Sequence, residues 1–153
     1  GYTAWTALGS DRVSQCDVIE FLPQVIHWLE QGLIPLSDKL NADHRLNVTQ
    51  SDVYQRLASP PKQKHDLILI DVDHSPDDNL DEANRIFYTV DGLQHAKLHL
   101  EADGLLGVWS YAESSRFVDA LHEVFREVRI EPVTVFNNLI NEEQTDWLLF
   151  ARD

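Results

Sequence analysis

The chain has 153 residues, of which 26 are acidic and 12 basic, so its formal net charge is −14. This length suits one domain with a real hydrophobic core. A surface this acidic repels phosphate backbones, which argues against a nucleic-acid partner. It attracts small cations such as amines, unless the charge serves solubility alone.

The sequence has a single cysteine, Cys16, within an apolar run typical of an inert core thiol. No stretch of about 18 apolar residues predicts a transmembrane helix, and no signal peptide is visible. We therefore expect a cytoplasmic enzyme or binding domain.

The first half of the chain alternates between helical and strand-like patterns. Helices are expected over 2–8, 23–32 and 52–58, and strands over 12–20 and 45–52. The helix over 23–32 starts on a proline and ends on a glycine, as helices commonly do. Each of the two strands closes on an acid, Glu20 in the first and Asp52 in the second.

The second half begins with "DLILIDVDHSP" (66–76), whose consecutive Leu and Ile residues predict a parallel strand covered on both faces. Ser75, Pro76 and the acids after them announce a helix, expected over much of 82–100. Asp71 closes the strand, as Glu20 and Asp52 close the earlier ones.

The remaining elements are a strand, a helix and two closing strands. The strand is expected over 104–110, and Ser110 with Glu113 has capping-box spacing ahead of the helix. Phe117, Leu121, Val124 and Phe125 form the apolar stripe of that helix. The runs 127–136 and 145–151, separated by asparagines, predict a hairpin.

This order of elements predicts an α/β fold with a mostly parallel sheet, helices on both faces and a C-terminal antiparallel hairpin. In such sheets ligands bind beyond the carboxyl ends of the strands. The three strand-end acids, Glu20, Asp52 and Asp71, are therefore the first candidates for a site.

Four segments then resemble motifs of one family. Gly1-Tyr2-Thr3-Ala4 looks like the tail of a glycine-rich first motif, and "VIEFLPQVI" (18–26) like an acid-then-proline junction. "QSDVYQRL" (50–57) resembles a Gly-Asp motif with Ser51 in place of Gly, and 66–110 resembles the fourth-strand motif with the helix and turn after it. Together they resemble spermidine synthase and its relatives, which have the S-adenosylmethionine-dependent methyltransferase fold. The resemblance implies a Rossmann-like class I fold over residues 1–153, as a single nucleotide-binding domain.

The sequence departs from this family in two places. It starts inside the first motif, so we expect a fragment that lacks the strand normally lying between those ending at Glu20 and Asp71. The family's catalytic loop reads Asp-Ser/Thr-Ser/Thr-Asp-Pro. Asp71 matches its first Asp, but His74 occupies the second Asp position, Pro76 is displaced and Asp73 is an extra acid.

The resemblance implies a role in nucleotide binding for several residues. Glu20 would accept hydrogen bonds from ribose hydroxyls, and Asp52 from the adenine amino group, supported by the N–H of Val53. Phe21 would lie against the adenine, and Gly1 belongs to the first motif. The alternatives are a solvated strand-end acid for Glu20, a helix cap for Asp52 and a core position for Phe21.

The catalytic candidates lie in the loop after the fourth-strand motif. Asp71 would hold a cationic amine near the sulfonium, because a charge that ends such an apolar run needs a partner or a ligand. His74 could take the amine's proton, or it could be a surface histidine. Asp73 could supply the missing carboxylate instead, since adjacent residues in an extended loop point apart. No metal site is expected.

The leading hypothesis is a spermidine synthase-like transferase that binds S-adenosylmethionine or its decarboxylated form and passes an aminopropyl group to a small amine, such as a polyamine. Methyl transfer with the same cofactor is the first alternative, and a non-catalytic ligand-binding domain the second. No nucleic acid or membrane partner is expected. A homodimer is compatible with the sequence, which does not determine the oligomeric state.

Overall fold

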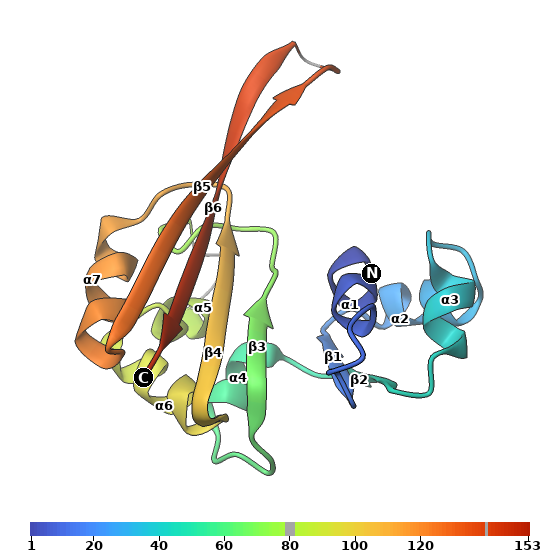
Figure 1. Cartoon of the computed structure of the whole chain (residues 1–153), viewed down its shortest axis with the longest axis horizontal. Coiled ribbons are helices and arrows are strands. Elements are labelled where there is room, and N and C mark those ends of the chain that lie inside the picture. The colour runs from blue at the N-terminus through green and yellow to red at the C-terminus, as the bar shows by residue number, and fades with distance from the viewer. Residues whose placement is uncertain (79–81, 140) are drawn as a thin grey trace. The chain divides into compact units, whose positions relative to one another are not determined.

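The computed structural model describes residues 1–78, 82–139 and 141–153. These residues divide into two compact units, Gly1–Val53 and Tyr54–Asp153 (Figure 1). No helix in the described part of the chain is both long and apolar enough to cross a membrane.

The first unit places three helices around a parallel strand pair. Its elements are α1 (Tyr2–Leu8), β1 (Cys16–Glu20), α2 (Pro23–Glu30), α3 (Ser37–Ala42) and β2 (Leu46–Gln50). The two strands pair in register from Cys16 with Leu46 to Glu20 with Gln50. Both strands are shorter than expected but lie inside the predicted ranges. Helix α3 was not predicted; it follows Leu36, whose backbone is left-handed with φ 68°.

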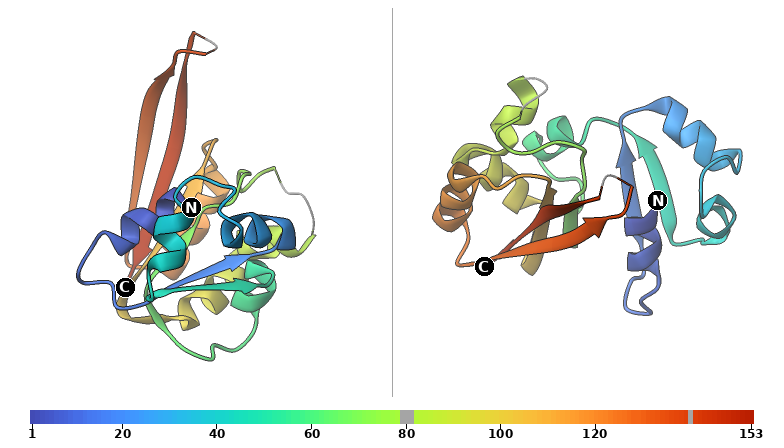
Figure 2. Two further views of the ribbon diagram at one scale, coloured as in Figure 1. Left: turned by 90° about the vertical axis from the view of Figure 1, so that its right-hand side faces the viewer. Right: turned by 90° about the horizontal axis from the view of Figure 1, so that it is seen from above.

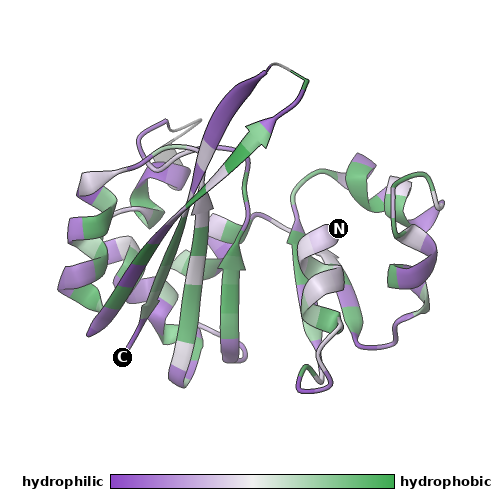
Figure 3. Cartoon of the chain, turned by 45° about the horizontal axis from the view of Figure 1, so that its top comes forward, coloured by the Kyte–Doolittle hydropathy of each residue, from purple (hydrophilic) through white to green (hydrophobic). Residues whose placement is uncertain are grey.

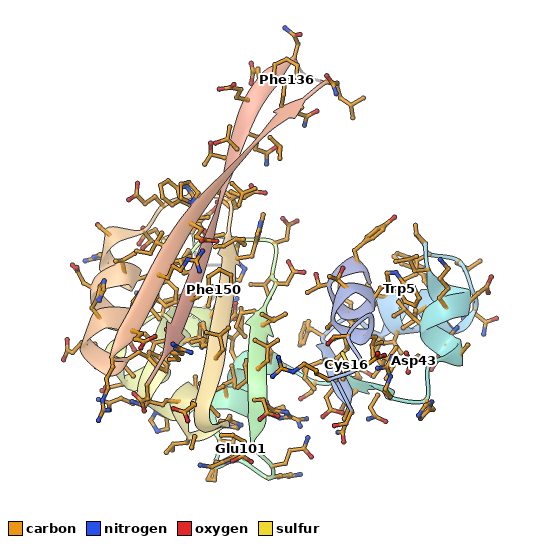
Figure 4. All side chains as sticks on the ribbon, viewed as in Figure 1. Trp5, Cys16, Asp43, Glu101, Phe136 and Phe150 are labelled. Carbon is orange, nitrogen blue, oxygen red and sulfur yellow. The ribbon has the colours of Figure 1, made fainter. Side chains whose placement is uncertain are left out.

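The Arg45 side chain connects the first unit's helix α1, the loop after it and the start of β2. Its guanidinium donates to the carbonyls of Leu8 (2.6 Å) and Val13 (3.0 Å). It also makes a two-pronged ion pair with Asp43, with N–O distances of 2.7 and 3.0 Å. Because an arginine fork matches a carboxylate in this way, the pair orients the guanidinium toward the carbonyls. Figure 4 marks Asp43 in this unit.

The described residues of the second unit form a four-stranded mixed sheet and four helices. Its elements are α4 (Val53–Ala58), which starts at the unit boundary, β3 (His65–Ile70), α5 (Glu82–Phe87), α6 (Val90–Leu98), β4 (Leu100–Ser110), α7 (Ser115–Val124), β5 (Glu127–Asn137) and β6 (Glu142–Arg152). The strand order is β3-β4-β6-β5. β3 and β4 are parallel, whereas β6 is antiparallel to both β4 and β5.

The core of the second unit lies between one face of this sheet and the helices, which gather on that side (Figures 1 and 2). The sheet contributes the buried side chains of Leu106, Val108 and Leu149. Helix α7 contributes Phe117 and Leu121, which are almost fully buried. These are positions of the predicted helical stripe, so the pattern identified the buried face of α7.

The opposite face of the sheet is apolar but partly open. The side chains of Leu67 and Leu69 in β3 are 44% and 43% exposed, although the sequence predicts a strand covered on both faces. The helices of this unit pack against the other face of the sheet, which leaves these two side chains exposed. Gly107 lies beneath this face: a Cβ there would meet Leu69 Cδ2 at 2.8 Å and Phe150 Cδ1 at 3.4 Å. Figure 3 shows β3 as hydrophobic along most of its length.

The hairpin of β5 and β6 extends beyond the rest of the sheet (Figure 2). β6 pairs with β4 only between Trp147 and Ala151, while its pairing with β5 continues to Asn137 and Glu142. Asn141 in the connecting turn has a φ of 58°, a conformation that asparagine tolerates well. The predicted hairpin and its asparagine turn are therefore confirmed, and Phe136 lies near its far end (Figure 4).

Two sequence expectations in the second unit are wrong in detail. The helix expected over 82–100 is two helices, because Thr89 interrupts it and caps α6 by accepting a hydrogen bond from the Gly92 N–H. The cap of α7 is Ser114 rather than Ser110: its Oγ accepts from Phe117 N at 3.3 Å. Ser110 instead ends β4, and its hydroxyl bonds the Ala112 carbonyl.

The Asp43–Arg45 pair makes a pH-dependent contribution to stability. The hydrogen bonds from Arg45 lower the pKa of Asp43 to about 2, whereas an unfolded Asp titrates near 3.9. The contribution is therefore complete above about pH 4 and is lost as the pH falls toward 2.

Asp43→Asn should lower the thermal midpoint at neutral pH, and the difference from the wild type should disappear near pH 2. Exposed Glu30→Gln is the control; a difference that stays constant on acidification contradicts the assignment.

Candidate functional site

Glu20 stands at the carboxyl end of β1 with its carboxylate held in a defined direction. The side chain is half-buried, and its Oε1 accepts a hydrogen bond from the backbone N–H of Leu22 at 2.8 Å. This contact uses one acceptor site of one oxygen, and an ionised carboxylate has about four. The remaining capacity is sufficient for the two hydroxyls of a vicinal diol.

Asp52 lies at the same edge of the first unit. The N–H of Ser51 donates to the Glu20 carbonyl at 3.0 Å, which extends the parallel pairing by one residue beyond β2. Asp52 follows directly and is half-buried, as is Val53, where α4 begins. The strand pairing thus brings two of the predicted nucleotide-binding acids to one edge, as the sequence indicates.

The other two predicted nucleotide-binding positions differ in their surroundings. Phe21 is largely exposed immediately after β1, so its ring is accessible to a flat ligand and is not part of the core. Gly1 precedes α1, and its carbonyl accepts from Trp5 N at 3.0 Å. Their nucleotide contacts remain predictions.

The loop after β3 folds sharply around Asp73. The N–H of His74 donates to the Val72 carbonyl at 2.9 Å, which closes a three-residue turn with Asp73 at its centre. Asp71 and Asp73 are both exposed, and so are Asp77 and Asp78 further along the loop. The turn therefore presents the two candidate carboxylates to solvent.

His74 points the other way, into the second unit. Its side chain is only 5% exposed, so it is not the surface histidine considered as an alternative. Its Nε2 lies 3.1 Å from the Tyr54 hydroxyl and 3.3 Å from the Tyr88 hydroxyl, and the two hydroxyls are 3.1 Å apart. Asp73 is thus exposed and His74 buried, although the loop that carries them is a tight turn and not the extended segment that the sequence predicts. The proposed catalytic role of His74 stays a prediction.

The two tyrosines belong to an aromatic cluster that surrounds His74. The Tyr88 ring packs edge-on against His74, Phe87 and Phe117, with centroid separations of 5.9, 5.0 and 5.0 Å. The pKa of Tyr88 is raised, mainly because the residue is buried, so its hydroxyl keeps its proton. Phe87 and Tyr88 are core residues.

A second connection links this loop to the end of β4. Parallel pairing puts the residues after β3 and β4 at the same edge of the sheet, and the Tyr111 hydroxyl donates to Asp78 Oδ2 at 2.5 Å. The N–H of Asp78 in turn donates to the Ser75 hydroxyl and carbonyl, at 3.2 and 3.1 Å. The loop is therefore held at His74, at Ser75 and at Asp78.

Tyr54, Tyr88 and Tyr111 were not among the site residues expected from the sequence. Tyr54 lies within the "QSDVYQRL" motif and Tyr111 follows a predicted strand end, so both positions carried a usable signal. Tyr88 lies within 66–110, the segment that resembles the fourth-strand motif and the helix after it, so it carried a signal of the same kind. Within the described ranges 1–78, 82–139 and 141–153, no group of three or more His, Cys, Asp or Glu residues could hold a metal ion.

Comparisons with known proteins identify the fold through structure alone. Neither the known family models nor the curated proteins include a match. Among solved structures, a spermidine synthase in complex with the transition state analogue AdoDATO has a TM-score of 0.67 and 18% identity, covering 97% of this chain and 48% of its own. The spermidine synthase of Thermotoga maritima has a TM-score of 0.65 and 15% identity, covering 94% of this chain and 46% of its own.

Methyltransferases share this architecture too. Human methyltransferase-like protein 13, in complex with SAH, has a TM-score of 0.63 and 16% identity, covering 90% of this chain and 60% of its own. The chain thus spans about half the length of the two spermidine synthases. The structural neighbours confirm the predicted fold class: this is the Rossmann-like fold of class I methyltransferases, with a C-terminal antiparallel hairpin.

The bond between Tyr111 and Asp78 should be visible in a tyrosine titration. It is the largest cause that raises the pKa of Tyr111, because a phenol that donates to a carboxylate is stabilised in its neutral form. Asp78→Asn should therefore lower the pKa of one tyrosine toward its usual value of about 10, measured by phenolate absorbance. Asp77→Asn is the control. Identical titrations for Asp78→Asn and the wild type would contradict this bond.

Proposed function

We propose that this chain is a spermidine synthase-like transferase domain that binds S-adenosylmethionine or its decarboxylated form. In the proposed reaction it passes an aminopropyl group to a small amine. The observation that carries the proposal is the turn at the end of β3, which exposes Asp71 and Asp73 while His74 is buried. The fold supports it, because ligands of such sheets bind beyond the carboxyl ends of the strands.

In the nucleotide part of the proposed site, Glu20 accepts hydrogen bonds from the ribose hydroxyls. Asp52 accepts from the adenine amino group, with the Val53 N–H supporting the ring, and Phe21 lies against it. The bond from Leu22 N–H supports this role for Glu20, because it fixes the carboxylate before the ligand arrives.

In the proposed transfer step, Asp71 holds the protonated amine by charge, and a carboxylate accepts the proton that makes the nitrogen nucleophilic. The nitrogen lone pair attacks the carbon bonded to the sulfonium, the C–S bond breaks, and methylthioadenosine leaves with the electron pair. Asp73 is the better placed acceptor of the proton, since it is exposed and His74 is not. Alignment of nitrogen and carbon accounts for much of the rate, because the sulfonium is already activated.

Methyl transfer with the same cofactor is the second candidate. One observation favours it: His74 stands at the second Asp position of the family loop and its Nε2 is engaged inside the unit. A methyl transferase can work by alignment and needs no second loop acid.

Calorimetry with both cofactor forms decides between the candidates. A preference for the decarboxylated form favours aminopropyl transfer and a preference for the carboxylated form favours methyl transfer. If the protein binds neither cofactor form, both candidate reactions are wrong.

The ribose assignment predicts a loss of nucleotide affinity in Glu20→Gln. Hydrogen bonds to a charged group contribute about 1.5–3 kcal/mol, which corresponds to about a 10- to 100-fold higher Kd. Calorimetry with S-adenosylhomocysteine or methylthioadenosine measures it. Glu30→Gln makes the same charge change at an exposed position of α2 and should bind like the wild type. Equal affinity for Glu20→Gln and the wild type removes Glu20 from the site.

The amine assignment predicts that Asp71→Asn loses product formation. An amide cannot pair with the amine's charge or take its proton, and general-base catalysis contributes about 10²- to 10⁴-fold. Release of methylthioadenosine from decarboxylated cofactor and 1,4-diaminobutane is the measurement. Asp77→Asn, in the same loop, should retain most of the activity. Retained activity in Asp71→Asn excludes Asp71 from the mechanism.

A further inference from the structure

The geometry points to His74 as a positioning residue: its ring, held by the hydroxyls of Tyr54 and Tyr88, fixes the turn that presents Asp73 and so sets the affinity for the substrate amine. This inference rests on the proposed function and deepens it. In this role the hydrogen-bonded cluster of Tyr54, His74 and Tyr88 contributes to recognition of the acceptor amine. The imidazole of His74 then takes no part in proton transfer.

The first argument is that Nε2 of His74 is already engaged. It is within hydrogen-bond distance of two hydroxyls that also bond each other. If Nε2 lacks a proton, one hydroxyl donates to it and the second hydroxyl donates to the first. If Nε2 carries a proton, it donates to a tyrosine oxygen. In both tautomers Nε2 is engaged in the cluster, and because the whole residue is only 5% exposed, either ring nitrogen would have to leave this buried position to accept a substrate proton.

The second argument is the short backbone path from His74 to Asp73. The two residues are adjacent, and the His74 N–H closes the turn on the Val72 carbonyl at 2.9 Å. With the imidazole anchored on one side, the side chain at the centre of the turn projects to the other side, where Asp73 is exposed. A shift of about 1 Å at a reacting group can change the rate about 10²-fold, so the anchor matters for the site.

The third argument is that the anchor is rigid. Tyr54, His74 and Tyr88 are each at most 7% exposed, and Phe87 packs against both tyrosine rings. The anchor therefore consists of groups on α4, on the loop after β3 and on the segment between α5 and α6. A positioning role predicts that removing a hydroxyl and removing the imidazole have the same kind of effect, and that these effects are not additive.

The experiment uses the full-length protein with His74→Gln, Tyr88→Phe and the double variant. Calorimetry measures the affinity for methylthioadenosine and, in its presence, for 1,4-diaminobutane. The expected result is that each single variant weakens diamine binding by about tenfold and leaves nucleotide binding within twofold, with no further loss in the double variant. His99→Gln is the matched control, because His99 is also 5% exposed and its Nε2 bonds the Ser59 carbonyl at 2.9 Å.

Two results would overturn the inference. Diamine binding that is unchanged in His74→Gln and Tyr88→Phe reduces the cluster to a structural element. Unchanged diamine binding combined with complete loss of turnover in His74→Gln alone restores His74 as the base.

The wild type separates this inference from the proposed function. A wild type that binds no nucleotide overturns the proposed function. Hydrogen exchange of the amides of 71–78 then tests the anchor by itself, and faster exchange in His74→Gln and Tyr88→Phe than in His99→Gln supports it. Equal exchange in the three variants overturns it.

Discussion

Parallel strand pairing is the constraint that positions the candidate residues within each of the two units. Two parallel strands end at the same edge, so the residues that follow them emerge together. In the first unit this pairing aligns Glu20 with the start of the segment that carries Asp52. In the second unit it brings the loop after β3 beside Tyr111, which bonds Asp78. The positions of the candidate residues follow from these edges, and the turn centred on Asp73 sets which of the loop side chains are exposed.

The aromatic cluster explains why a histidine is compatible with position 74. An ionised aspartate in this buried position would be costly, since it would lose its hydration and gain only the two tyrosine hydroxyls. An uncharged imidazole fits the same space and satisfies the hydroxyls. The difference at position 74 from the loop motif that the sequence resembles is thus coupled to burial, and the exposed acid is Asp73, one residue earlier.

Local sequence patterns predicted most of the helices and strands, because the signals for these elements lie within each segment of the sequence. Apolar runs ending in acids located β1, β2 and β3, and the 3.6-residue stripe identified the buried face of α7. The split between α5 and α6 was missed because it depends on a cap at Thr89 that apolar periodicity does not reveal. The cap of α7 was misplaced because Ser110 and Ser114 are equally good caps by composition, and β4 continues through Ser110.

The candidate site was less predictable than the fold. The sequence identified the strand-end acids, but the direction in which Asp73 and His74 point depends on partners distant along the chain. Tyr54 and Tyr88 are 20 and 14 residues from His74, and no pattern in one sequence links them. The exposure of Leu67 and Leu69 was missed for a related reason: a run of apolar residues does not tell whether helices cover one face of a strand or both.

The apolar run of β3 has a consequence for the folding of the protein. The sequence "HDLILI" combines high β-propensity with a low net charge, so it can self-associate while it is exposed before the sheet forms. Asp66 near its start and Asp71 just after its end act as gatekeepers, because like charges oppose the stacking of identical strands. Asp71 thus opposes self-association of the unfolded chain by the same negative charge that holds the amine in the proposed reaction.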